Sequence, residues 1–198
     1  MNCGESLLEL KHVTNENIHT FEIPKSKTHL KIRGRLDHFK APDHISYLNI
    51  SKTWLKTIEL NDKLEFLHCY SNKLKTLELP ANILVVDVGR NELENITARE
   101  PLTNLLRLDI SYNKFKHFDL KLPLNTMEYF YMGGNPDIKI KYLDFLFLCD
   151  EYNVCYDLVD GDCQHILGDG KLMYNLDVRR RVEQHSYQGK KYIDVSKY

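Results

Sequence analysis

The sequence has no long uninterrupted run of apolar residues and almost no net charge. Its 198 residues include 27 Lys and Arg against 28 Asp and Glu, which gives a formal net charge of −1. A membrane-spanning helix needs about 20 consecutive apolar residues, so no such span is expected. A balanced charge gives no general attraction to nucleic acid or to a membrane surface. We therefore expect neither of them as a partner.

The sequence also lacks the features of a secreted protein. Residues 1–11 include Glu5 and Glu9 and do not have a basic segment followed by an apolar one, so no signal peptide is expected. The five cysteines are an odd number without regular spacing, which favours free thiols over a disulfide framework. We expect an intracellular, cytoplasmic protein. Hydrophobic residues make up 42% of the chain, which is typical of a folded core rather than of disorder.

A pattern of apolar residues and asparagine recurs along the chain. Residues 64–79 read Leu-x-x-Leu-x-Cys-x-x-Asn-x-Leu-x-x-Leu-x-Leu, and the same offsets recur in residues 83–96 and 105–120. Residues 45–60 fit with Thr53 in the place of asparagine, and residues 127–135 form the last copy. Three close matches in succession exclude a chance pattern.

This pattern resembles the leucine-rich-repeat superfamily, whose template is L-x-x-L-x-L-x-x-N-x-L. The resemblance implies an α/β right-handed solenoid, or horseshoe, with a parallel sheet on its concave side. The second apolar positions are 18, 19, 19, 22 and 22 residues apart, at Leu30, Leu48, Leu67, Val86, Leu108 and Phe130. Repeats this short leave little room for a helix, so we expect extended convex segments, as the Leu-x-x-Leu-x-Leu-Pro endings also suggest. Such short repeats are similar to those of bacterial effector proteins and of some large DNA viruses.

Three regions follow from the pattern. Residues 1–27 are interpreted as a degenerate N-terminal capping repeat, in which Lys11 occupies an apolar position. Residues 28–135 hold the leucine-rich repeats. Residues 136–198 are interpreted as a C-terminal cap and charged tail. Asn135, Pro136 and Asp137 resemble the start of a helix, and the apolar run in residues 138–148 predicts a helical cap over the last strand.

Alternation along each strand separates structural from candidate binding residues. Within a repeat the apolar positions point inward, and the residues between them face the concave surface. In this family the asparagine amide bonds backbone groups of neighbouring repeats. The sequence therefore predicts a structural ladder, which consists of Asn72, Asn91, Asn113 and Asn135.

The concave surface carries many aromatic side chains for a solvent-facing sheet. Aromatic residues and arginine are common hot spots of protein interfaces, although strands also favour aromatics for cross-strand pairing. We expect a monomer that binds a protein partner without catalysis. One alternative is a structural, self-associating repeat protein. The candidate partner-binding residues are Tyr47, Phe66, His68, Tyr70, Asp87, Arg107, Asp109, Tyr129 and Tyr131.

The C-terminal segment leaves an alternative class open, an enzyme or a metal site. Cys149, Cys155, Cys163 and His165 could hold zinc, but they lack the Cys-x2–4-Cys pairs that structural zinc sites prefer. Cys155-Tyr156-Asp157 matches the Cys-x-Asp motif of bacterial leucine-rich-repeat ubiquitin ligases, without the large catalytic domain that those enzymes carry. We therefore expect no catalytic residue, no metal and no cofactor.

Overall fold

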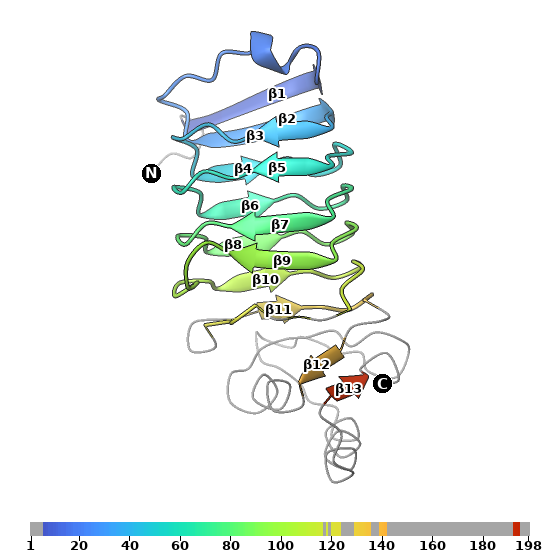
Figure 1. Cartoon of the computed structure of the whole chain (residues 1–198). Helices are drawn as coiled ribbons and strands as arrows, with labels where there is room; N and C mark the ends of the chain where they lie inside the picture. Colours follow the sequence, from blue (N-terminus) through green and yellow to red (C-terminus); the bar gives the residue numbers. More distant parts are fainter. Residues whose placement is uncertain are drawn as a thin grey trace, which may run out of the picture.

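A computed structural model describes residues 6–116, 118, 120–123, 129–135, 139–141 and 192–194. The described residues from Leu7 to Tyr131 wind as a stack of turns, and each turn gives one strand to the same sheet (Figure 1). This seven-stranded sheet, which we call the long sheet, has the order β1-β2-β4-β6-β8-β10-β11, and every neighbouring pair is parallel. The parallel-strand solenoid predicted from the repeats is confirmed.

The strands of the long sheet are mostly three residues long. They are β1 (Leu7–Thr14), β2 (His29–Arg35), β4 (Tyr47–Asn49), β6 (Phe66–His68), β8 (Val85–Asp87), β10 (Arg107–Asp109) and β11 (Tyr129–Tyr131). A 3-10 turn, Ile18–Thr20, follows β1. The opposite side holds β3 (His38–Lys40), β5 (Thr57–Glu59), β7 (Thr76–Leu79) and β9 (Asn95–Ala98). There β3 pairs with β5 and β7 pairs with β9, both in parallel, so the predicted extended segments form short strands.

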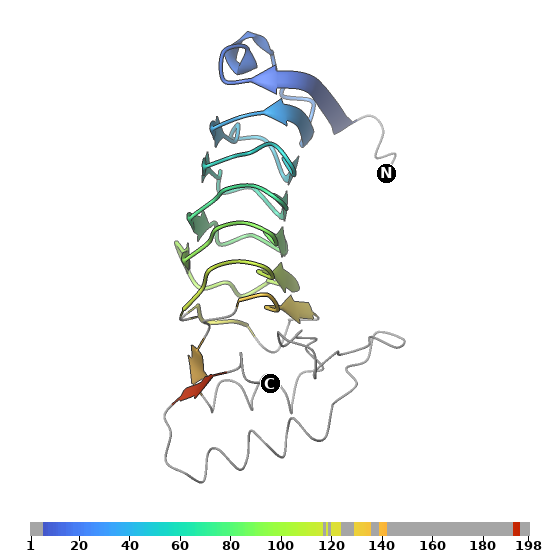
Figure 2. The same cartoon turned by 90° about the vertical axis from the view of Figure 1, so that its right-hand side faces the viewer.

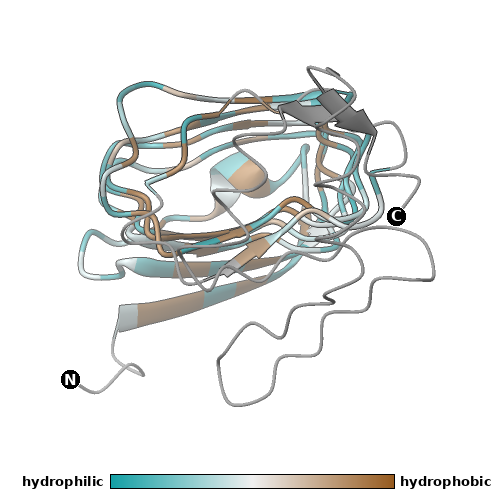
Figure 3. Cartoon of the chain, turned by 90° about the horizontal axis from the view of Figure 1, so that it is seen from below, coloured by the Kyte–Doolittle hydropathy of each residue, from teal (hydrophilic) through white to brown (hydrophobic). Residues whose placement is uncertain are grey.

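The turns stack into a nearly straight column. The long sheet runs along one flank, and β3, β5, β7 and β9 run along the other (Figure 2). A view along the stack shows that successive turns repeat the same flattened outline (Figure 3). The long sheet is the side predicted to be concave. Because the column is only slightly curved, we call its solvent side the outer face of the long sheet.

Equivalent apolar residues fill the space between the two flanks. The second apolar position is fully buried in every turn from β2 to β11, at Leu30, Leu48, Leu67, Val86, Leu108 and Phe130. The next inward position is buried as well, at Ile32, Ile50, Cys69, Val88, Ile110 and Met132. Each turn buries its apolar side chains against the turns above and below, so no turn has a core of its own.

Buried asparagines satisfy the backbone where each strand of the long sheet ends. Asn91 Nδ2 donates to the carbonyls of Cys69 (2.9 Å) and Val88 (3.0 Å), and Asn91 Oδ1 accepts from the amide of Leu74 (3.0 Å). One side chain thus bonds its own turn and the preceding one. Equivalent bonds are made by Asn72, Asn113 and Asn135.

Thr53 occupies the ladder position one turn earlier. Its hydroxyl donates to the Ile50 carbonyl at 2.9 Å, and its amide donates to Asn72 Oδ1 at the same distance. The bond from this position to the preceding turn comes from the backbone, because the Thr53 carbonyl accepts from the Leu36 amide at 2.8 Å.

The residue before each ladder position has a positive φ. Ser71 (57°), Arg90 (52°) and Tyr112 (52°) adopt this conformation, and Gly134 does so with φ 73°. Lys52, before Thr53, has φ 61°. L-residues rarely adopt this region, so the recurrence shows that the geometry of the corner outweighs the local preference of each residue.

A bulge explains the polar residue in the first repeat. The pairing of β1 with β2 shifts between Leu10, which pairs with Ile32, and Val13, which pairs with Gly34. Lys11 therefore lies exposed and Val13 takes the buried position. Gly34 permits this close approach, because a Cβ there would lie 2.0 Å from the Val13 carbonyl oxygen.

The prediction of a C-terminal helix is wrong at residues 139–141, near the start of the predicted helix. Residues Lys139–Lys141 form strand β12, which pairs antiparallel with β13 (Tyr192–Asp194). Residues 138–142 read Ile-Lys-Ile-Lys-Tyr, an alternation of period two that is typical of a strand and that the apolar content of the wider run obscured. The rest of the predicted helical cap, from residue 142 to residue 148, lies outside the described residues.

Candidate protein-binding surface

In-register pairing arranges the outer face of the long sheet in rows. The middle residue of each short strand is buried, and its two neighbours point outward. The first row consists of His29, Tyr47, Phe66, Val85, Arg107 and, by backbone register, Tyr129. The second row consists of Lys31, Asn49, His68, Asp87, Asp109 and Tyr131. The register therefore places all the candidate binding residues except Tyr70 in these two rows.

Four rings form an aromatic cluster at the β2, β4 and β6 end of this face: His29, Tyr47, Phe66 and His68. Tyr47 lies at its centre, with ring centroids 5.3 Å from His29, 6.2 Å from Phe66 and 5.4 Å from His68. All four side chains are half-buried, so each keeps part of its surface toward solvent. The spacing suits favourable ring–ring contact, which fixes the cluster before any partner arrives.

Tyr70 lies just beyond the end of β6 and extends the aromatic surface. Its ring is half-buried, and the Arg90 guanidinium carbon lies 5.9 Å from the ring centroid. The cation approaches from the following turn. Tyr70 therefore joins the outer face of the long sheet to the edge where its strands end.

An acidic pair, Asp87 and Asp109, adjoins the aromatic cluster. His68 Nδ1 lies 3.7 Å from Asp87 Oδ2. Asp109 Oδ1 accepts from the amide and the hydroxyl of Ser111, at 2.9 and 2.6 Å. Burial raises the pKa of Asp109, and the neighbouring charge of Asp87 raises it further. The face thus holds two adjacent carboxylates, one of them poorly solvated.

At the far end of this face the chain pairs a cation with an aromatic ring. The Arg107 guanidinium carbon lies 5.5 Å from the centroid of the Tyr131 ring. Tyr131 is partly buried and packs against the core, so it contributes to the last turn as well as to the surface. The side chain of Tyr129 lies outside the described residues.

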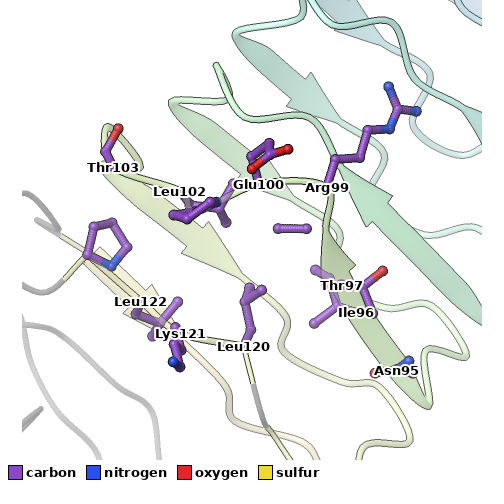
Figure 4. A pocket seen from close by; sticks show the side chains of 13 residues that line it. Asn95, Ile96, Thr97, Arg99, Glu100, Leu102, Thr103, Leu120, Lys121 and Leu122 are labelled. Atoms are coloured by element: carbon purple, nitrogen blue, oxygen red, sulfur yellow. The ribbon is translucent and has the colours of Figure 1, made fainter.

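A separate hollow lies on the opposite side of the column, where the repeats lengthen from 19 to 22 residues. It has a volume of about 690 Å³ and is lined by β9 and residues 99–103 and 120–123 (Figure 4). Much of its lining is aliphatic, from Ile96, Leu102, Leu120 and Leu122. The Arg99 guanidinium is bonded to Glu78 Oε2 (3.0 Å) and to Asp62, which ties three turns together.

Cys69 lies among the residues that the structure describes, and the other four cysteines lie outside them. Cys69 is a fully buried free thiol, as its inward position predicted, and burial raises its pKa to about 12. Cys149, Cys155, Cys163 and His165, which carry the zinc and Cys-x-Asp alternatives, lie outside the described residues. Within the described ranges, no group of three or more His, Cys, Asp or Glu side chains could hold a metal ion. No helix there is long and apolar enough to cross a membrane.

Sequence reasoning missed several exposed side chains at the edge where the strands of the long sheet end. Trp54 and Tyr112 are 52% and 55% exposed. Arg90 lies between Tyr70 and Tyr112, 4.9 Å from the Tyr112 ring centroid. A usable signal was present in the sequence, because all of these residues are next to a ladder position. The template itself assigns those positions no role.

Comparisons with known proteins bear on the fold. No protein-family model matches the chain, and no curated protein matches it. Among solved structures, YopM from Yersinia enterocolitica WA-314 is similar, with a TM-score of 0.54 and 21% sequence identity. The match covers 70% of this chain and 30% of that of YopM, so the chain matches less than a third of that protein. The similarity is one of fold, and with the asparagine-marked turns it shows that the chain is a leucine-rich-repeat-like solenoid protein.

Proposed function

We propose that the chain is a non-catalytic binding module whose outer face of the long sheet takes a protein partner. The observation that supports this most is the aromatic cluster with Tyr70 beside it. These rings run from β2 to just beyond β6, three of them contact Tyr47, and all of them remain partly open to solvent. Large, rigid aromatic side chains lose little entropy on binding and dominate the energetics of many interfaces.

The charges beside the cluster suggest what the partner carries. Asp109 is partly desolvated in the free protein, and it lies beside a second carboxylate, Asp87. A partner arginine or lysine placed between them would offset that repulsion. The proposed partner surface therefore has an apolar centre, which covers the rings, and a basic group at its side. Repeat solenoids commonly use such extended surfaces for binding, which agrees with this assignment.

The test truncates two rings that lie on this face. Phe66→Ala with Tyr70→Ala removes half-buried side chains and no fully buried one. Lys75→Ala is the matched control, because Lys75 is exposed in the turn that follows Tyr70 but precedes β7 on the opposite side. Partners would be captured from lysate by each variant, identified by mass spectrometry, purified, and titrated by calorimetry.

Loss of two hot-spot rings should weaken binding by about 2 kcal/mol or more, roughly thirtyfold. The thermal midpoint should stay close to that of the wild type, and Lys75→Ala should change neither quantity. A folded double variant that binds the same purified partner with unchanged affinity would move the site off this face.

A further inference from the structure

A column of exposed side chains runs along the edge where the strands of the long sheet end. The residue after the ladder position is Trp54, Lys73, Glu92 and Lys114 in successive turns, and Arg35 occupies the same place before β3. Lys52 and Arg90 stand immediately before their ladder positions, so they belong to the same edge. We call the group Arg35, Lys52, Trp54, Lys73 and Arg90 the Trp54 edge.

Trp54 is held between two cations in an unusual backbone conformation. The Lys73 ammonium lies 4.4 Å from the ring centroid, and the Arg35 guanidinium carbon lies 5.2 Å from it. The side chain is 52% exposed and its φ is 68°. A bulky residue seldom adopts a positive φ, and such strain is frequent at functional positions. An exposed aromatic ring is thus fixed, with cations from the turns on both sides.

Two cations of the Trp54 edge act on nearby carboxylates without pairing with them, since the charge of Arg35 helps to lower the pKa of Asp37 and that of Lys73 helps to lower the pKa of Glu92. Within the described part of the chain, no ion pair involves Arg35, Lys52, Lys73 or Arg90. The next carboxylate along the edge, Glu92, is bonded to Lys114 Nζ at 2.8 Å. The edge is therefore a local basic patch on a chain whose net charge is −1.

A shallow hollow opens within this patch. It has a volume of about 310 Å³ and is lined by Lys52, Trp54, Ser71, Asn72 and Lys73. The lining combines two ammonium groups with one aromatic ring. That combination suits a ligand that carries both a carboxylate and an apolar group.

We propose that the Trp54 edge binds a short acidic segment of another protein. The carboxylates of that segment would face the four cations, and one of its apolar side chains would contact the exposed part of the Trp54 ring. Parallel strands are spaced about 4.8 Å apart, so the four turns of the patch match roughly four or five residues of extended peptide. This surface meets the proposed binding face only at Tyr70, whose ring centroid lies 5.9 Å from the Arg90 guanidinium carbon, and the inference does not rest on the proposed function.

The length of the patch argues against nucleic acid. Proteins that bind DNA through its backbone typically make about 6–10 phosphate contacts along a continuous basic surface. Here Glu92 interrupts the column in the fourth turn, and Lys114, the cation of the next turn, is bonded to that same carboxylate. A short acidic peptide fits this extent, and a phosphate backbone would meet the carboxylate.

The chain offers a direct readout, because Trp54 is its only tryptophan. The full-length protein would be titrated with a short synthetic peptide of alternating Glu and Asp around one Phe, and tryptophan fluorescence would be recorded. The control peptide replaces Glu and Asp with Gln and Asn. We expect the acidic peptide alone to change the fluorescence with a saturable curve, and added salt to weaken its binding.

Two charge-reversal variants localise the site. Arg35→Glu with Lys73→Glu should weaken peptide affinity about tenfold or more. Lys63→Glu has the same kind of charge change on an exposed lysine that precedes β6, at the opposite edge, and should bind like the wild type. Equal affinity in the double variant, or no fluorescence change with the acidic peptide, would overturn the proposal. Tighter binding of a single-stranded oligonucleotide than of the peptide in the same buffer would overturn it in favour of nucleic acid.

Discussion

Single side chains complete the backbone hydrogen bonding at the corners of this solenoid. Asn91 is 8% exposed and joins carbonyl and amide groups of two turns through one amide group. In a repeat without helices, those buried backbone groups have few other partners. The asparagine positions are therefore under a chemical constraint, since a side chain of the same size without both a donor and an acceptor cannot replace it.

Replacement of Asn91 with Leu should lower the free energy of unfolding by roughly 1–3 kcal/mol, because the Cys69 and Val88 carbonyls and the Leu74 amide lose their partner. Asn104→Leu is the control, since Asn104 is exposed. Urea denaturation of both variants checks this. An Asn91→Leu midpoint equal to that of the control would count strongly against the ladder.

Asp109 should make stability depend on pH. Its folded-state pKa is raised above the ordinary value of 3.8 by burial and by Asp87. The folded protein therefore binds this proton more tightly than the unfolded chain does, and stability falls as pH rises from the ordinary value through the folded pKa. Asp109→Asn removes this titration and keeps an acceptor for the Ser111 amide. We expect the urea midpoint of Asp109→Asn minus that of the wild type to be larger at pH 7 than at pH 4. A midpoint difference that does not change with pH would contradict a raised pKa at Asp109.

At the scale of the element, the corner before each ladder residue forces a left-handed conformation. Ser71, Arg90 and Tyr112 adopt this conformation although their Cβ atoms make it unfavourable, whereas Gly134 has no Cβ and adopts it without that steric cost. A Cβ on Gly134 would also lie 2.5 Å from Cδ1 of the Tyr112 ring. The glycine thus permits both the backbone conformation and the position of the neighbouring ring.

Gly134→Ala should destabilise the protein by about 1 kcal/mol or more, through the positive φ and the contact with Tyr112. In the double variant Gly134→Ala with Tyr112→Ala the steric clash is absent, so the two substitutions together should destabilise the protein less than the sum of their separate effects. A double-mutant cycle by urea denaturation measures this coupling. Strict additivity of the two substitutions would show that the contact has no energetic weight.

The repeats could be predicted from the sequence because every turn restates the same rule. Inward positions such as Leu67 and Val86 recur at fixed offsets, so their burial and the sheet register follow from period alone. The departures are local events that a template does not contain. The bulge that moves Lys11 outward is one, and the strand β12 in place of a helix start is another.

The repeat pattern predicts only part of the candidate binding site. Alternation places Tyr47, Phe66 and His68 on one face, but it gives no distances and does not show that they form one cluster. The Trp54 edge was missed for a physical reason. The backbone has a positive φ at three of its residues, Lys52, Trp54 and Arg90, and no residue preference signals that conformation.

At the scale of the whole molecule, a stack of turns has two ends, and each end limits the stability of the solenoid. At the first end, β1 pairs with β2 through a bulge. At the other, β11 pairs with β10, and no strand among the described residues pairs with its second edge. Phe130 and Met132 are nevertheless almost fully buried in that last turn. An open strand edge above apolar side chains is a site for aggregation.

Deletion of residues 136–198 should therefore leave a chain that aggregates or expresses poorly. The truncation keeps every strand of the long sheet and the last ladder residue, Asn135, so a failure would arise from exposure of the final turn rather than from loss of a repeat. Deletion of residues 1–5 is the control, because it removes no strand of the long sheet and should leave a soluble protein. Size-exclusion chromatography with light scattering, followed by thermal unfolding of the soluble fraction, distinguishes the two. A truncated chain that is monomeric and unfolds cooperatively near the wild-type midpoint would show that residues 136–198 form a separate module, and that the solenoid closes its own end at β11.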